Sequence, residues 1–129
     1  MEVLVDTSVW IDYFKGAESV GDLDILIDEN LVVMNDIVLA ELVPYLKIKR
    51  QSKVIKLLQD VKRLPLEINW HEIIEFQYVC LKSGANGVGI PDLLIAQNAM
   101  QNGYEVYSLD KHFKLLNQIL KLELYSIKG

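Results

Sequence analysis

Apolar positions along the chain fall into two kinds of pattern. Short runs rich in Val, Leu and Ile predict strands, and longer stretches in which apolar residues recur every three or four positions predict helices. Pro65 places one run at a sheet edge or at the start of a strand. The expected strands are 2–6, 31–34, 64–68, 105–109 and 122–127, and the expected helices are 9–15, 20–28, 37–46, 52–62, 70–82, 93–102 and 113–120.

This alternation of strand and helix is typical of an α/β protein. Parallel strands need crossover helices, so we expect a mostly parallel sheet of four to five strands, flanked by helices on both faces. The 129 residues contain no internal repeat or linker, and their number suits a single domain over residues 1–129.

Composition narrows the class further. Hydrophobic residues make up 51% of the chain and charged residues 24%, which predicts a folded protein. The single cysteine, Cys80, cannot form an internal disulfide, and the N-terminus lacks the pattern of a signal peptide, so we expect a cytoplasmic protein. No apolar run approaches the roughly 18 residues of a membrane span. The net charge of -5, taken as a bulk property, argues against nucleic acid as a partner.

Four acidic residues occupy positions where acids are unusual. Asp6 and Asp110 each end an apolar strand, at the tips where open α/β sheets bind ligands. Asp92 opens an apolar helix. Glu41 is the only charged residue within positions 37–46, so we expect it to face other parts of the protein.

Each acid also has an ordinary structural explanation. Asp6 and Asp110 can cap the helices that follow them, Asp92 can complement a helix N-terminus, and Glu41 can be solvated. If the sheet is parallel, however, all four carboxylates can converge on one crevice. Like charges at about 4 Å repel by on the order of 4 kcal/mol per pair, and a divalent cation removes that cost. An all-oxygen set suits Mg²⁺ or Mn²⁺, and such centres hydrolyse phosphodiesters.

The same acids stand in four short motifs, and with these motifs the whole chain resembles the PIN domain family, in particular its VapC-like toxins. The motifs are DTSVWID at 6–12, LAEL at 39–42, IPDLLIA at 90–96 and SLDKHF at 108–113. The resemblance implies a metal-dependent endoribonuclease whose acidic quartet is Asp6, Glu41, Asp92 and Asp110, holding Mg²⁺ or Mn²⁺.

The resemblance also assigns supporting residues. Ser108 matches a Ser or Thr that the family has near its last acid, and Ser8 is expected to orient a carboxylate or a water in the same way. One position departs from the family pattern: many relatives have a further Asp where this chain has His112. We expect His112 to be a surface residue, with substrate contact as the alternative, and His71, on another helix, to be structural.

Basic residues gather in one segment. Positions 47–63 hold seven of the thirteen Lys and Arg residues and a single acid, Asp60. A charge run on a helix is often only a solvated face. Because this segment follows Glu41, it can also guide phosphates toward the metal, with Lys49, Arg50 and Lys53 as the candidate RNA contacts.

The expected partners are an RNA substrate, a cognate antitoxin and a second copy of the chain. The resemblance implies that the apolar residues of 10–14 and 23–27 form the surfaces that bind a second copy and the antitoxin. The alternatives are a solitary PIN nuclease and a non-catalytic RNA-binding or assembly module. Phosphohydrolases of the HAD type need a second Asp where this chain has Ser8, and no G-x-G-x-x-G motif for a dinucleotide follows the first strand.

Overall fold

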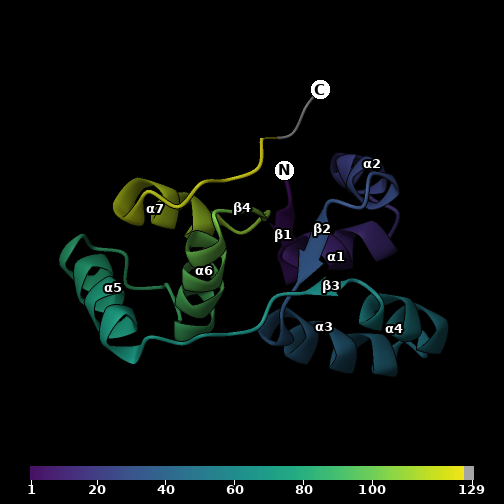
Figure 1. Cartoon of the computed structure of the whole chain (residues 1–129), viewed down its shortest axis with the longest axis horizontal. Coiled ribbons are helices and arrows are strands. Elements are labelled where there is room, and N and C mark those ends of the chain that lie inside the picture. Colours follow the sequence, from purple (N-terminus) through teal and green to yellow (C-terminus); the bar gives the residue numbers. More distant parts are fainter. Residues whose placement is uncertain (127–129) are drawn as a thin grey trace.

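The structure is a computed structural model that describes residues 1–126, with one parallel sheet and seven α-helices among them (Figure 1). In chain order the elements are β1 (Val3–Val5), α1 (Thr7–Phe14), a 3₁₀ turn η1 (Glu18–Val20), α2 (Asp22–Asp28), β2 (Val32–Met34), α3 (Asp36–Ile48), α4 (Ser52–Gln59), β3 (Lys62–Arg63), α5 (Trp70–Lys82), α6 (Ile90–Asn102), β4 (Glu105–Tyr107) and α7 (Lys111–Leu120). The predicted α/β class is confirmed.

The sheet has the strand order β3-β2-β1-β4, and all its strand pairs are parallel. Val3, Leu4 and Val5 are all buried, as are the three residues of β2. Successive side chains of a strand point to opposite faces, so the sheet is covered on both sides. None of the helices in residues 1–126 combines the length and the apolar character that crossing a membrane would require.

Two of the five predicted strands differ from the structure. The run at 64–68 is not a strand: β3 lies just before it, and Leu64 N–H makes one further bond, to the Met34 carbonyl at 2.7 Å. Pro65 has no N–H to continue the pairing. The neighbouring strand β3 lies at one edge of the sheet, but Pro65 itself lies beyond its end.

The predicted strand at 122–127 is reduced, over its described residues, to a single bridge between Leu124 and Val106; position 127 lies outside the described part. Lys121 has a left-handed backbone with φ of 61°, which turns the chain after α7, so that only Glu123 and Tyr125 exchange bonds with Val106. Among the helices, 20–28 begins later, at Asp22 after η1, and 52–62 ends at Gln59 because Lys62 enters β3.

Polar residues end the three longer strands and begin helices at the same edge. Asp6 follows β1 and caps α1, Asn35 follows β2 and caps α3, and Asp110, three residues beyond β4, caps α7. Each side chain accepts a hydrogen bond from a backbone N–H in the first turn of its helix. Parallel strands bring these caps to one edge, which we call the C-terminal edge of the sheet.

A buried amide chain joins the helices above this edge. Asn35 Nδ2 donates to Asn98 Oδ1 at 3.0 Å, and Asn98 Nδ2 donates to the Pro65 carbonyl at 3.0 Å. Asn35 and Asn98 are almost fully buried. This chain of hydrogen bonds therefore fixes the start of α3 against α6. Helix α3 carries Glu41, and helix α6 carries Asp92.

Candidate metal centre at the C-terminal edge of the sheet

Asp6 is the most enclosed acid of the edge, with 6% of its surface exposed. Its Oδ2 accepts hydrogen bonds from the hydroxyls of Ser8 and Ser108, both at 2.9 Å, and the two hydroxyl oxygens lie 3.3 Å apart. No bond from the described residues reaches Oδ1. Two hydroxyls thus hold one oxygen of the carboxylate and leave the other for an outside ligand.

The same serines connect Asp6 to the end of β4. Ser8 Oγ accepts from Leu109 N–H and Ser108 Oγ accepts from Asp110 N–H, each at 3.0 Å. The structure therefore brings both serines onto the Asp6 carboxylate and ties the tip of β1 to the backbone that carries Asp110.

Glu41 lies on α3, and its Oε1 accepts a hydrogen bond from Thr7 Oγ1 at 3.2 Å. The expectation that Glu41 faces other protein is wrong, because the residue is exposed while Leu42 beside it is fully buried. Partial burial still raises the pKa of the Glu41 carboxyl, and the charge of Asp6 raises it further; Asp92 and Asp110 add smaller effects, while the Thr7 bond opposes them. Glu41 therefore belongs electrostatically to the edge.

Asp92 and Asp110 meet at the imidazole of His112. The ring atom Nδ1 lies 3.3 Å from Asp92 Oδ2 and 3.4 Å from Asp110 Oδ1. Gly89 N–H also donates to Asp92 Oδ2, at 3.3 Å. Within residues 1–126, Asp92, Asp110 and His112 form a group whose ligand atoms all lie within 4.8 Å of one another.

Electrostatics connects this group to the remaining acids. Burial raises the pKa of Asp92, and the negative charges of Asp110 and Asp6 raise it further, while the Gly89 N–H and His112 lower it. The predicted quartet thus gathers at one edge, but its tightest part is two of the acids plus His112. Asp6 and Glu41 stand beside this group.

Sequence reasoning placed one residue of the site wrongly and did not single out two others. His112, expected at the surface, is half-buried and contacts both carboxylates. Thr7 and Asn35 were not singled out. Asn35 directly follows β2 and Thr7 lies two residues after β1, so a polar residue close behind an apolar strand is the signal that could have found them. The cap roles of Asp6 and Asp110 are also real, so capping and clustering are compatible functions of the same side chains.

The donor set fits a divalent cation. Carboxylate oxygens are ligands of Mg²⁺ and Mn²⁺, and an imidazole nitrogen suits later divalent metals. A cation would relieve the repulsion that, with burial, raises the pKa of Glu41 and Asp92.

The basic segment divides into two parts. Lys62 bonds Glu2 at 2.8 Å and Arg63 lies 3.3 Å from Asp36, so these two cations serve the fold. Lys49, Arg50 and Lys53 are exposed where α3 ends and α4 begins. At 1.5 Å of rise per residue, Lys49 lies about 12 Å along α3 from Glu41. Lys49, Arg50 and Lys53 are therefore within reach of an extended substrate bound at the C-terminal edge of the sheet.

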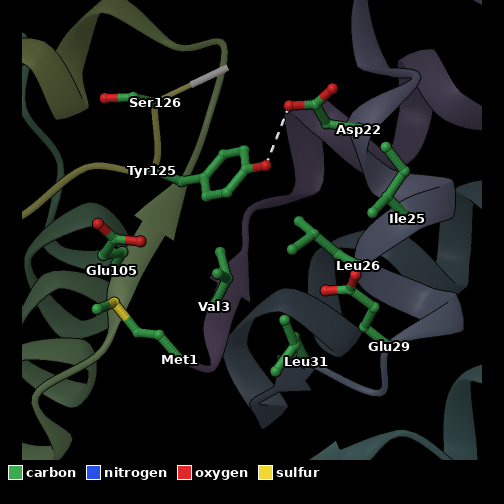
Figure 2. Close-up of a pocket in the computed structure, with 10 residues that line it drawn as sticks. All are labelled: Met1, Val3, Asp22, Ile25, Leu26, Glu29, Leu31, Glu105, Tyr125 and Ser126. Carbon is green, nitrogen blue, oxygen red and sulfur yellow. Dashed lines mark hydrogen bonds between the residues drawn. The ribbon is translucent and has the colours of Figure 1, made fainter. Parts of the chain in front are cut away.

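A separate cavity of about 520 Å³ lies at the opposite edge, where the strands begin (Figure 2). It is lined by Met1, Val3, Asp22, Ile25, Leu26, Glu29, Leu31, Glu105, Tyr125 and Ser126. Its dashed bond in Figure 2 joins Tyr125 Oη, the donor, to Asp22 Oδ2 at 3.0 Å. The candidate chemistry therefore does not coincide with this cavity.

A parallel α/β fold with acids from several segments gathered at the C-terminal edge defines a small class of proteins. The model of the PIN domain matches residues 3–118, and the chain belongs to the PIN domain family. A search of curated proteins found no match.

Several solved structures share the fold over nearly the whole chain. VapBC2 from Rickettsia felis, bound to a DNA fragment from its promoter, is 24% identical with a TM-score of 0.74, covering 99% of this chain and 100% of the other. VapBC-1 from nontypeable Haemophilus influenzae is 22% identical with a TM-score of 0.71, covering 98% of each chain. FitAcB from Neisseria gonorrhoeae is 19% identical with a TM-score of 0.67, covering 96% of each.

Proposed function

We propose that this protein is a Mg²⁺- or Mn²⁺-dependent endoribonuclease and the toxin of a toxin–antitoxin pair. One observation carries the proposal: Asp92 and Asp110 converge with His112 at the edge where Asp6 and Glu41 also lie, and the neighbouring acids help burial to raise the pKa of Glu41 and Asp92. Membership of the PIN domain family supports the same reading.

In this proposal Asp6, Glu41, Asp92 and Asp110 hold the metal and carry the catalysis. When bound, a divalent ion lowers the pKa of a coordinated water and stabilises negative charge on the phosphate. The chain's own residues set the geometry. Ser8 and Ser108 fix Oδ2 of Asp6, and Thr7 fixes Oε1 of Glu41.

The RNA is proposed to approach along the end of α3. Lys49 lies 5.9 Å from the centre of the Tyr45 ring, and both residues line a cavity of about 300 Å³ together with Phe14, Lys15, Leu46 and Gln51. Aromatic rings beside cations suit single-stranded nucleic acid, because bases stack on rings while cations bind phosphates. Lys49, Arg50 and Lys53 are the residues we assign to this path.

Reversing these three charges tests the path. We expect Lys49→Glu, Arg50→Glu and Lys53→Glu together to weaken cleavage about tenfold or more at low salt, and less as salt rises, with metal affinity nearly unchanged. A control triple, with Lys82, Lys114 and Lys121 changed to Glu, alters net charge equally. Equal cleavage by both triples across a salt titration would rule out the path.

The partners follow from the same comparison. VapBC2 from Rickettsia felis and VapBC-1 from Haemophilus influenzae support a cognate antitoxin for this chain. We also propose a homodimer in the cytoplasm. Trp10 and Phe14 stack on each other, and Leu23 is fully buried, so most of the early apolar residues belong to the core. Of the predicted surface at 23–27, Ile25 and Ile27 remain exposed, and four further exposed apolar residues lie on α5: Trp70, Ile74, Tyr78 and Leu81.

Cleavage of labelled RNA by the wild type and Asp6→Asn, in Mg²⁺, Mn²⁺ or EDTA, tests the activity. Asparagine keeps the helix cap but loses the charge, so folding should be preserved. We expect cleavage by the wild type with metal and none in EDTA. Equal activity of the variant, or activity in EDTA, would sink the metal-nuclease proposal. RNA binding without any cleavage would favour a non-catalytic module, and cleavage that no upstream gene product inhibits would favour a solitary nuclease.

A further inference from the structure

His112 occupies a distinctive place in the candidate metal centre. It stands two residues after Asp110, in the first turn of α7, and its backbone N–H donates to Asp110 Oδ1 at 2.9 Å. Its ring atom Nδ1 faces oxygens of two carboxylates that come from different helices' N-termini, Asp92 and Asp110. The imidazole therefore lies between the two acids that form the tight part of the site.

The spacing of these atoms is that of neighbouring ligands on one ion. Two donors at about 2.1 Å from a metal, subtending 90–110°, lie about 3.0–3.4 Å apart. The Nδ1 atom is 3.3 Å from Asp92 Oδ2 and 3.4 Å from Asp110 Oδ1. Ligand atoms of Asp92 and Asp110 lie within 4.8 Å of each other, so a modest shift of these side chains is enough for all three residues to share a cation.

The other side of the ring is confined by the loop before α6. A Cβ atom built on Gly87 would lie 3.1 Å from His112 Nε2, closer than ordinary van der Waals contact. Glycine at this position lets the loop approach the ring and hold it with Nδ1 toward the acids. The imidazole is therefore placed before any ligand binds.

We infer that His112 is itself a metal ligand, binding through Nδ1, and that the centre prefers Mn²⁺ to Mg²⁺. This inference rests on the proposed function, because it concerns the metal of the same site. Mg²⁺ is a hard ion that takes oxygen ligands, whereas imidazole nitrogen suits later divalent metals, whose affinity rises along the series from Mn²⁺. A nitrogen in the set shifts the balance away from Mg²⁺.

Electron spin-echo modulation of bound Mn²⁺ tests the ligand directly, because it detects nitrogen bonded to the ion without any measure of activity. We expect a signal from one coordinated imidazole in the wild type and its loss in His112→Gln. The matched control is His71→Gln, which removes the other histidine of the chain, an exposed residue on α5, and should keep the signal.

Calorimetric titration of the same proteins gives the metal preference. We expect the ratio of Mn²⁺ to Mg²⁺ affinity to fall at least about tenfold in His112→Gln, since even residues that only support a ligand change metal affinity by 10–100-fold. His112→Asp, an all-oxygen set, should bind Mg²⁺ better than His112→Gln does. Circular dichroism of the metal-free variants checks that they fold.

The two proposals fail differently. Mn²⁺ that binds the wild type without a nitrogen signal, or a signal that persists in His112→Gln, overturns the role of His112 and leaves the nuclease proposal standing. A wild type that binds neither ion and cleaves RNA in EDTA overturns the metal nuclease itself.

Discussion

The two edges of the sheet both carry acids, but they use them differently. At the edge where the strands begin, Asp22, Glu29 and Glu105 border an apolar cavity (Figure 2). Asp22 accepts a bond from Tyr125, and burial together with Asp22 raises the pKa of the Tyr125 hydroxyl to about 12, so this hydroxyl stays a neutral donor. Within residues 1–126, these acids form no group of three or more metal-ligating side chains.

At the C-terminal edge the acids lie together, and burial and the neighbouring charges raise the pKa of Glu41 and Asp92. They are held by hydroxyls, a glycine N–H and an imidazole, which fix carboxylates without neutralising all of their charge. The cavity of about 520 Å³ therefore lies away from the candidate site, which the gathering of like charges marks. Our proposed function rests on like charge gathered at one place and not on empty space.

The largest expected contrast between the edges is catalytic. Asp6→Asn should lower RNA cleavage by at least about a hundredfold, because a lost metal ligand exceeds the 10–100-fold typical of supporting residues. Glu105→Gln, which removes a carboxylate at the start of the neighbouring strand β4, should leave cleavage rates unchanged. Comparable losses in the two variants would abolish the distinction between the edges.

A smaller effect is expected from the serines on Asp6. Ser8→Ala and Ser108→Ala should each lower cleavage about tenfold, mainly through weaker metal binding, which titration with Mn²⁺ would measure. Since both hydroxyls bond the same oxygen, Oδ2, the double variant should lose less than the product of the two single losses. Ser126→Ala, at the other edge, serves as control, and strictly multiplicative losses would argue against a shared target.

The smallest expected effect is on stability and has the opposite sign. The pKa of Asp92 is raised in the fold, so its contribution to stability is complete below the ordinary carboxyl pKa, about 4, and is lost as the pH rises through the raised value. In EDTA at neutral pH, Asp92→Asn should therefore raise the melting temperature by a few degrees, and the gain should vanish in acid.

With Mn²⁺ present, the wild type should melt at a higher temperature than Asp92→Asn, because the ion should bind and stabilise the wild type more strongly. Thermal melts at several pH values, with and without Mn²⁺, measure both effects. A variant that melts below the wild type in EDTA at neutral pH would show that Asp92 serves the fold rather than the site.

The sequence predicts the fold class, and the place of Asp6 and Asp110 near strand ends, because both follow from local rules. An acid directly after an apolar strand, as at Asp6, must lie at a strand tip, and parallel strands bring such tips together. The strand expected at 122–127 was not predicted correctly by these rules. Its apolar composition does not reveal that, among the described residues, its pairing is a single bridge at Leu124.

Side-chain direction and cross-chain contacts were harder to predict. Glu41 stands in an apolar stretch, yet its own position faces outward while Leu42 turns to the core. His112 contacts Asp92 from twenty residues away, and that contact depends on how α6 and α7 pack. Such information lies in tertiary packing and not in the pattern of single residues.

The buried amide chain from Asn35 through Asn98 to the Pro65 carbonyl bears on how the site is assembled. It clamps α3 to α6 at a place that needs neither substrate nor ion. The carboxylates are thus brought together by folding alone. The free energy of folding therefore already includes the cost of their repulsion. A cation would arrive at a preorganised receptor, and its binding energy would go into affinity rather than into ordering the chain.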